Sequence, residues 1–363
     1  MTAIAYARVE PSTDDIGTPD IPPLPQPFEF TGSGSEYFRI WIVNLLLTII
    51  TLGIYSAWAK VRRTRYFYDN TRLASTSFEY HGSPVAILRG RIVAVLFLAA
   101  YNVVARISDT AGVLMLMMLG ALIPWLIWKS LQFKLYNSSY RGIRFGFRGS
   151  IGRVYFVYLL LPVLSVLTAY LLAPFTHQRM KKFQHEESRY GATSFSFHAS
   201  VGSFYKAYLL AFAIAFAGVA VIALGFSGTM GALVKSESAG TPGMGMIGLM
   251  VLIMYVWAFL LIPIFLTLIQ NLIWNNTRLG EHAFESRMKS GRMAFIAITN
   301  LIGIVITLGL YIPFAQVRAL KYRIESMSMM PAAPLDYFIA AVQVDASATG
   351  EGASDLLDFD LSL

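Results

Sequence analysis

Three short clusters of basic residues, each at the end of an apolar segment, hold the side chains best suited to bind a ligand. They follow the pattern R-x-x-[RK]-[YF], and their paired cations are Arg62 and Arg65, Arg179 and Lys182, and Arg318 and Lys321. Guanidinium and ammonium groups contact phosphate and carboxylate oxygens, so a site for an anion or an anionic lipid is expected where the clusters converge. The alternative is simple anchoring, because cations beside an apolar segment also contact lipid headgroups.

Residues for catalysis or metal binding are sparse. The chain has no cysteine, and none of its five histidines stands in the close spacing of a metal site. A phosphate-binding glycine loop, a dinucleotide-binding glycine motif and a nucleophile elbow with a suitable context are also missing from the sequence. We therefore expect no enzyme, no catalytic residue, no metal or other cofactor and no nucleic-acid partner.

The composition indicates a membrane protein. Hydrophobic residues make up 56% of the 363 residues and charged residues 14%, whereas a soluble globular protein has about 25% charged residues. Crossing a bilayer takes roughly 20 helical residues, and seven uncharged segments are candidates: 40–59, 92–105, 111–128, 154–176, 207–234, 238–277 and 293–317. The second reaches this length if Arg89 and Arg91 extend to the interface. The expected fold is an all-α polytopic membrane protein with about seven membrane-embedded helices and short F-x-F hairpins between them.

The chain also contains segments that resemble one another at fixed sequence offsets. A shift of 117 residues aligns Phe28 and Phe30 with Phe145 and Phe147, and Phe78 with Phe195. A further shift of 139 carries Phe145 to Phe284. Each copy joins an F-x-F hairpin to an apolar helix and then to a basic cluster. This pattern predicts internal repeats at 28–66, 145–183 and 284–322.

The distribution of bases favours a topology in which the three repeat helices enter and leave the membrane on one side. Positive residues mark the cytoplasmic side. If all seven segments cross, one side collects 17 of the 29 bases; if the repeat helices turn back, only Arg106 and Lys235 lie outside and 27 bases share one face. Pro174, Pro313 and the T-L-G triplets at 51–53 and 307–309 interrupt these helices. We expect re-entrant or broken helices, with full crossing as the alternative, and both termini in the cytoplasm.

One long segment and two shorter ones resemble a known family. They are SGSEYFRIWIVNLLLTIITLGIYSAWAKVRRTRYFYDNTRL at 33–73, GEHAF at 280–284 and TLGLYIPFAQVRALKYR at 307–323. From these segments the chain is identified as a member of the YjgN-like bacterial inner-membrane proteins, a family without assigned function. The resemblance implies a multi-pass protein of the bacterial inner membrane, with no substrate, cofactor or catalytic residue to carry over. One departure is Ala74, where the sister repeats have glycine.

Two acidic segments flank the expected membrane domain at 28–330. Residues 1–27 carry four acids, one base and a proline-rich stretch, which is typical of a disordered tail. Residues 331–363 form an acidic tail with six acids and no base. The domain between them has 28 bases against 11 acids, a net charge of +17.

Two functions agree with these features. Repeated, interrupted helices favour a transport-like protein that handles a solute, an anion or a lipid. The alternative is a non-transporting scaffold whose basic cytoplasmic face binds anionic lipid or a protein partner. Besides the lipid bilayer, the sequence identifies no partner or substrate, and a homo-oligomer stays among the options.

Overall fold

The computed structural model describes residues 24–235 and 241–332. All but the last four residues of the expected N-terminal tail, and all but the first two of the acidic C-terminal tail, lie outside the described residues. Gln26 and Pro27, assigned above to the tail, belong to the first strand.

Ten short strands close into an antiparallel barrel. They are β1 (Gln26–Phe30), β2 (Thr71–Leu73), β3 (Thr76–Tyr80), β4 (Ser138–Tyr140), β5 (Ile143–Phe147), β6 (Ser188–Tyr190), β7 (Thr193–Phe197), β8 (Thr277–Leu279), β9 (His282–Ser286) and β10 (Met327–Met330). Each strand pairs with the next in sequence, and β1 pairs with β10 to complete the circle. Closure leaves no unpaired edge, so strands of only three to five residues still form a continuous sheet.

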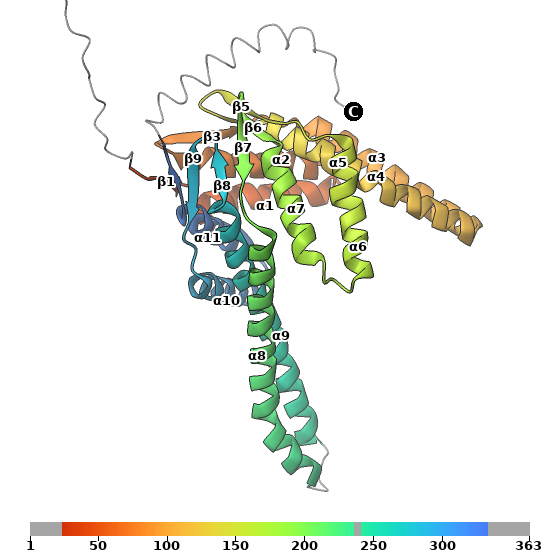
Figure 1. The fold of residues 1–363 in the computed structure, drawn as a ribbon. Helices are drawn as coiled ribbons and strands as arrows, with labels where there is room; N and C mark the ends of the chain where they lie inside the picture. The colour runs from red at the N-terminus through yellow and green to blue at the C-terminus, as the bar shows by residue number, and fades with distance from the viewer. Residues whose placement is uncertain (1–23, 236–240, 333–363) are drawn as a thin grey trace, which may run out of the picture.

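Five helical hairpins connect alternate pairs of strands. Three are short: α1 (Gly34–Ile50) with α2 (Ser56–Asp69); α5 (Ile151–Tyr155), the π-helix η1 (Phe156–Leu160) and α6 (Leu161–Leu167) with α7 (Ala173–Glu186); and α10 (Ser290–Ile306) with α11 (Ile312–Glu325). Two are long: α3 (Pro84–Ile107) with α4 (Asp109–Tyr136), and α8 (Val201–Lys235) with α9 (Thr241–Trp274). Each hairpin leaves the barrel from an odd-numbered strand and returns to the next strand, so all five lie at one end of the barrel. The long hairpins extend well past the short ones, α8–α9 downward and α3–α4 to the right (Figure 1).

The expectation of an all-α protein with about seven membrane-embedded helices is therefore wrong. A closed ten-stranded barrel organises the chain, and its F-x-F segments are strands of that barrel. Within the described residues, four helices are long and apolar enough to cross a membrane: Pro84–Ile107, Asp109–Tyr136, Val201–Gly228 and Gly245–Trp274. Strands of three to five residues are too short to show a clear alternating pattern, and β1 pairs with a strand from the far end of the chain.

Each of the three repeat segments is split into two helices by the same turn. Thr51, Thr168 and Thr307 follow the first helix, and each hydroxyl oxygen accepts a hydrogen bond from the backbone N–H four residues later, at 2.9, 3.4 and 2.9 Å. The two residues after each threonine have positive φ: Leu52 and Gly53, Ala169 and Tyr170, and Leu308 and Gly309. Left-handed residues end helical hydrogen bonding, so the chain reverses toward the barrel.

The four tight turns at the opposite end of the barrel also use left-handed residues. Gly191 and Gly280 have φ of 56° and 55° in the turns before β7 and β9, and the other two turns each have two such residues. Ala74 and Ser75 have φ of 47° and 62°, and Arg141 and Gly142 have φ of 48° and 78°. Two positive φ values in a two-residue loop are typical of the hairpin turn that matches strand twist.

Aromatic residues attach the hairpins to the barrel. Phe30, Phe147 and Phe197 are the last residues of β1, β5 and β7, and all three are buried. Each packs on the first turns of the following helix, against Tyr37, Val154 and Phe204 respectively. The second aromatic of the F-x-F pattern therefore holds the base of a hairpin.

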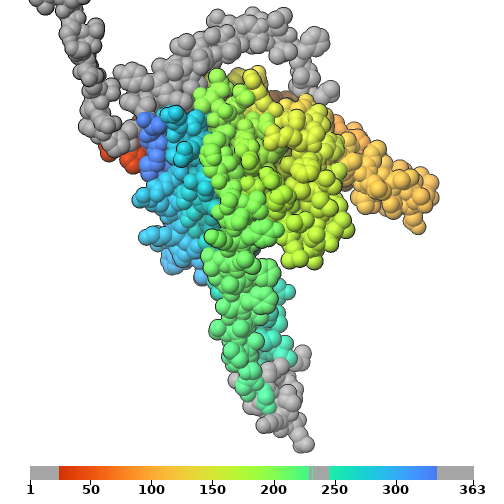
Figure 2. Space-filling view, viewed as in Figure 1, coloured from red at the N-terminus to blue at the C-terminus, as the bar shows by residue number. Residues whose placement is uncertain are grey.

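Neighbouring hairpins also pack on one another around the barrel axis. The contacts are α2 with α3, α4 with α5, α7 with α8, α9 with α10, and α11 with α1. The helices thus form a closed ring at one end of the barrel. The long hairpins project from this body (Figure 2).

Candidate functional site

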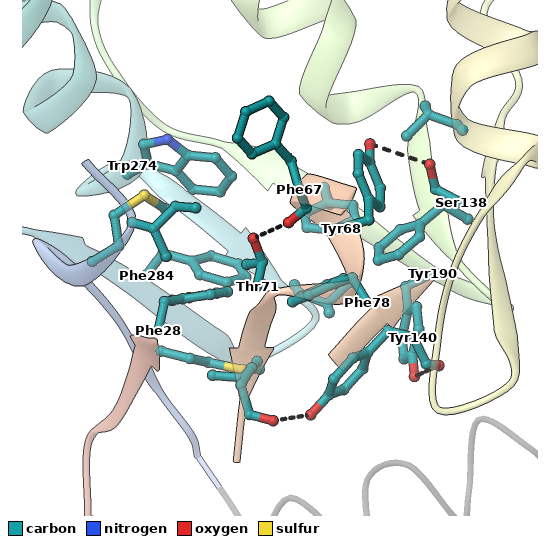
Figure 3. A pocket seen from close by; sticks show the side chains of 18 of the residues that line it. Phe28, Phe67, Tyr68, Thr71, Phe78, Ser138, Tyr140, Tyr190, Trp274 and Phe284 are labelled. Carbon is teal, nitrogen blue, oxygen red and sulfur yellow. Dashed lines mark hydrogen bonds between the residues drawn. The ribbon is translucent and has the colours of Figure 1, made fainter. Parts of the chain in front are cut away.

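Five phenylalanines lie at one level inside the barrel, one on each odd-numbered strand. They are Phe28, Phe78, Phe145, Phe195 and Phe284, and we call them the phenylalanine floor. Neighbouring ring centroids are 6.3 to 6.5 Å apart around the whole circle. The planes of neighbouring rings differ by only 15–33°, so the rings lie nearly flat across the barrel. Phe28, Phe78 and Phe284 are labelled in Figure 3, where they lie below Phe67, Tyr68 and Trp274.

Each phenylalanine faces an inward residue on the next even-numbered strand. The pairs are Phe28 with Leu73, Phe78 with Tyr140, Phe145 with Tyr190, Phe195 with Leu279, and Phe284 with Met329. The tyrosine hydroxyls donate to backbone carbonyls: Tyr140 to Leu73 at 2.7 Å and Tyr190 to Tyr140 at 2.9 Å. Burial, and then the neighbouring Tyr140, raise the pKa of Tyr190, so this phenol stays protonated as a donor. The barrel is therefore filled by apolar and internally satisfied side chains at this level.

A cavity of about 450 Å³ lies between the phenylalanine floor and the ends of the surrounding helices. We call it the chamber. Its walls include Phe67 and Tyr68 of α2, Leu135 of α4, Trp274 of α9, and Leu320 of α11. In Figure 3, Phe67, Tyr68 and Trp274 lie above the floor and enclose this space. The volume is in the range of ligand pockets in proteins, about 300–1,000 Å³.

Few polar groups reach the chamber, and most bind one another or the backbone. The Thr71 hydroxyl donates to the Phe67 carbonyl at 2.7 Å. The Ser138 hydroxyl lies 2.7 Å from the Lys134 carbonyl and 3.3 Å from the Tyr68 hydroxyl. Among the residues of 24–235 and 241–332 that line the chamber, Lys134 is the one charged side chain. The chamber thus offers a large apolar surface and a single cation.

Among the described residues, helix α7 contributes none to the lining of the chamber, but it contacts one wall, Trp274, through a histidine, and it carries a second lysine one turn away. The His185 ring stacks on Phe197 with centroids 5.3 Å apart and meets Trp274 edge-on at 5.8 Å. Burial, and then the charge of Lys181, lower the pKa of His185 to about 4, so its imidazole is neutral near pH 7. Burial, and then the charge of Lys134, lower the pKa of Lys181.

Arg62 and Arg65, expected to bind an anion, lie exposed on α2. The Arg62 guanidinium donates to the Tyr55 hydroxyl at 3.1 Å, and Arg65 donates to the Tyr80 carbonyl at 3.4 Å. Both contacts are with nearby parts of the chain, so each cation is held close to its own helix.

The equivalent residues on α7 and α11 also have local partners. Arg179 lies over the Phe175 ring at 5.0 Å, and Lys182 pairs with Glu186 at 3.6 Å. Arg318 donates to the Thr299 hydroxyl at 2.7 Å and to the Asn300 side chain at 3.4 Å. Lys321 pairs with Glu325 at 3.6 Å.

The fold brings two of the three basic clusters into neighbouring hairpins. The hairpin α10–α11 packs on α1–α2, where the Tyr37 hydroxyl donates to Gln316 at 3.1 Å. The cluster on α7 is set apart, because the long hairpins stand between α5–α7 and the other two in the order around the barrel. The six cations are therefore distributed around the helical ring.

The phenylalanine floor and the lysines near the chamber were not identified as a site from the sequence. The fixed offsets of the F-x-F segments marked all five phenylalanines as equivalent in two sets, but an offset does not say that they meet. Lys181 stands inside the second basic cluster, at a position that the pattern leaves unspecified. Within residues 24–235 and 241–332, no three side chains of His, Asp or Glu group together to hold a metal ion.

Comparison with known proteins identifies one matching family profile. It is described as "Bacterial protein of unknown function (DUF898)" and matches residues 25–356. The inner membrane protein YjgN of Salmonella typhimurium strain LT2 is 35% identical over 143 residues, which are 39% of this chain and 36% of that protein. Proteins of the same name from Escherichia coli O157:H7 and Escherichia coli K12 are 34% and 33% identical over 141 residues, or 39% of this chain and 35% of each relative.

The alignments therefore span only about a third of the length of these relatives. No solved structure matches the chain. The resemblance to YjgN-like proteins predicted from residues 33–73 is confirmed. The names of the relatives and the four long apolar helices support a location in the inner membrane.

Proposed function

We propose the following function for this chain, which belongs to the DUF898 family of bacterial proteins: it holds the apolar tail of a membrane amphiphile in the chamber. The observation that carries the proposal is the 450 Å³ chamber between the phenylalanine floor and the ends of the helices. The proposal keeps the lipid-handling part of the transport-like function expected from the sequence, and it assigns no catalytic step.

The chemistry of the chamber favours an apolar guest. Its walls are mainly aromatic and aliphatic, and the hydroxyls of Thr71 and Ser138 already have hydrogen-bond partners. Removing apolar surface from water contributes about 25 cal/mol per Å², and a guest adds dispersion contacts with the flat phenyl rings. A polar solute would give up its hydrogen bonds to water and regain few here.

The elements around the chamber suggest that a lipid bilayer, which contains such apolar guests, lies nearby. The helices that frame it include α4 and α9, whose apolar lengths suit a bilayer. The tips of two short hairpins also present apolar side chains: Leu52 is 94% exposed and Leu308 is 95% exposed. Exposure of this kind is typical of a surface in contact with lipid or a partner.

A neutral probe tests the proposal without involving charge. Purified full-length protein is titrated with radiolabelled oleyl alcohol, and Leu320→Trp, which fills the chamber, is compared with Leu114→Trp on the exposed face of α4. We expect Leu320→Trp to weaken binding by about tenfold or more, because the larger side chain occupies the space of the guest. Leu114→Trp should bind as the unaltered protein does. Equal binding by both variants would refute the proposal.

The alternative function is a scaffold that binds anionic lipid through exposed cations. It is favoured by the exposure of Arg62 and Arg65 on α2 and of Lys321 on α11. Under this alternative, replacing all six predicted cations by glutamine abolishes binding to anionic vesicles and leaves oleyl alcohol binding unchanged. Under the chamber proposal, oleyl alcohol binding depends on Leu320 and not on these cations.

Two further features stay as proposals. The repeats at 28–66, 145–183 and 284–322 are supported by the common turn after Thr51, Thr168 and Thr307. A cytoplasmic location of both termini is supported by the segregation of bases described above. Cysteine labelling in intact cells tests this location, since the chain has no native thiol.

A further inference from the structure

Lys134 and Lys181 form a pair of cations beside an apolar chamber. Lys134 lines the chamber from the last turn of α4. Lys181 lies on α7, whose Phe183 belongs to a cluster that also receives Leu131 and Leu135 of α4. The last turns of α4 and this part of α7 therefore share one hydrophobic cluster, and the charge of Lys134 acts on Lys181.

Lys181 is partly buried and lacks an acidic partner in the described part of the chain. Its ammonium group donates to the Gln184 side chain at 3.2 Å, and the Gln184 amide in turn donates to the Tyr158 hydroxyl at 2.7 Å. These partners are neutral. A partly buried cation whose partners are neutral retains capacity to bind an anion.

The carboxylates closest in sequence to Lys181 already pair with other cations. Glu186 pairs with Lys182 at 3.6 Å, and Glu187 pairs with Arg153. Both histidines on the same face of α7 lie one turn from Lys181, at His177 and His185, and each contacts aromatic rings. The neutral His185 adds no negative charge to this region.

We infer that the chamber binds an anionic amphiphile, with its apolar chain over the phenylalanine floor and its head between Lys134 and Lys181. This inference rests on the proposed function and adds the class of ligand. An ammonium group binds a carboxylate or a phosphate through charge-assisted hydrogen bonds, so a fatty acid and a single-chain phosphate share the required chemistry. The apolar chain supplies affinity, and the two lysines select the charge of the head.

The test compares three ligands with the same chain and different heads. Oleate, oleyl phosphate and oleyl alcohol are titrated against full-length protein in nanodiscs of zwitterionic lipid. The variants are Lys134→Gln, Lys181→Gln and Lys181→Arg, and the matched control is Lys182→Gln, one residue along α7, whose lysine pairs with Glu186. A preference for oleate over oleyl phosphate, or the reverse, identifies whether the site prefers a carboxylate or a phosphate head.

We expect the unaltered protein to bind at least one anionic ligand about tenfold or more tightly than oleyl alcohol. Lys134→Gln and Lys181→Gln should lose most of this preference while still binding oleyl alcohol, which also shows that they fold. Lys181→Arg and Lys182→Gln should keep it. Equal affinity for charged and neutral ligands, with binding abolished by Leu320→Trp, would overturn this inference and leave the chamber proposal standing. Binding that Leu320→Trp does not affect would overturn the proposed function itself.

Discussion

Each phenylalanine of the floor packs against two others. If one ring is removed, its neighbours cannot fill the cavity without losing their own ring contacts. Phe145 lies 6.4 and 6.5 Å from Phe78 and Phe195, and 5.1 Å from Tyr190, between ring centroids. Phe145→Ala should reduce the free energy of unfolding by about 3 kcal/mol, since it removes a large apolar side chain from a packed layer. Thermal unfolding in detergent measures the loss. The control is Phe156→Ala in η1, where the side chain is 48% exposed, and a similar loss there would contradict a special role for the floor.

The turn between β2 and β3 holds an alanine in a left-handed conformation. Ala74 has φ of 47°, while Gly142, in the turn between β4 and β5, has φ of 78° with open space around it. A side chain in this conformation costs roughly 1 kcal/mol, so Ala74→Gly should stabilise the protein and Gly142→Ala should destabilise it by similar amounts. Opposite shifts in the midpoint of thermal unfolding are expected. Shifts of the same sign would refute the account of these turns.

The charge of Lys181 predicts how anion binding depends on pH. Burial, and then Lys134 of α4, lower the pKa of Lys181. The other titratable groups nearby are His177 and His185 on α7, Tyr158 of η1 through Gln184, and Tyr208 of α8 through His177. Because a carboxylate prefers the protonated lysine, oleate binding should be strongest at neutral pH and weaken as pH rises through the lowered pKa.

Oleate affinity is measured from about pH 7 to about pH 10. The loss of binding should occur below the ordinary pKa of lysine, near 10.4. Lys181→Arg should hold oleate across the same range, since guanidinium stays protonated. Oleyl alcohol binding should be flat. A fall in oleate binding that is identical in the unaltered protein and in Lys181→Arg would assign the effect to another group.

At the scale of residues, the sequence predicted which phenylalanines are equivalent but not that they lie close together. Fixed offsets linked Phe28 to Phe145 and Phe284, and Phe78 to Phe195, but only the closed sheet places these two sets in one circle. The basic clusters drew attention to Arg179 and Lys182, while Lys181 between them donates to Gln184 and interacts with Lys134 of α4. Charge alone does not reveal which member of a cluster lies near a cation of another helix.

The tips of the short hairpins are apolar surfaces at the scale of a single element. Leu308 is 95% exposed at the turn between α10 and α11, and burying such a side chain contributes about 1.5–3 kcal/mol. We expect this tip to enter the bilayer. A fluorophore on Leu308→Cys should show blue-shifted emission in liposomes and quenching by a lipid-embedded quencher, since the chain has no other thiol.

The control for this labelling is Arg144→Cys, on an exposed position of β5. Its fluorophore should emit as in water and respond to a water-soluble quencher. If Leu308→Cys reports the same environment as Arg144→Cys, the short hairpins do not insert.

The long hairpin α8–α9 depends on one close approach between its helices. The Trp257 ring occupies the space that a side chain at Gly218 would need, and its indole N–H donates to the Ala215 carbonyl at 3.2 Å. Gly218→Leu should force the helices apart and cost about 1–3 kcal/mol, as overpacking does elsewhere. A lower unfolding midpoint and faster proteolysis are expected. Gly225→Leu, with open space around that glycine, should change neither, and equal effects would contradict the packing account.

At the scale of elements, apolar length located the helical regions correctly but did not determine their paths. The segments 40–59, 154–176 and 293–317 were long enough to cross, yet each is broken where a threonine precedes two left-handed residues. The T-L-G triplets gave a visible signal at two of these turns. The third turn uses Ala169 and Tyr170, which no turn preference would have marked.

The whole molecule is a closed circle of five helical hairpins on a closed barrel. Both the barrel and the ring of helices are closed by contacts between the two ends of the described chain: β10 pairs with β1, and α11 packs on α1. A pairing between distant segments has no local sequence pattern, because it depends on every intervening hairpin returning to the barrel. For this reason the barrel and the chamber inside the circle could not be predicted from the sequence.

The most direct test of the account is to find where the tail of a bound amphiphile lies. Full-length protein in membranes is irradiated with a fatty acid that carries a photoreactive diazirine near its chain end, and the adducts are mapped by mass spectrometry. The account predicts adducts on the phenylalanine floor or on Trp274, and their loss in Leu320→Trp but not in Leu114→Trp. Adducts confined to the exposed faces of α3 and α8, such as Leu96 and Leu210, with equal yield in both variants, would contradict it.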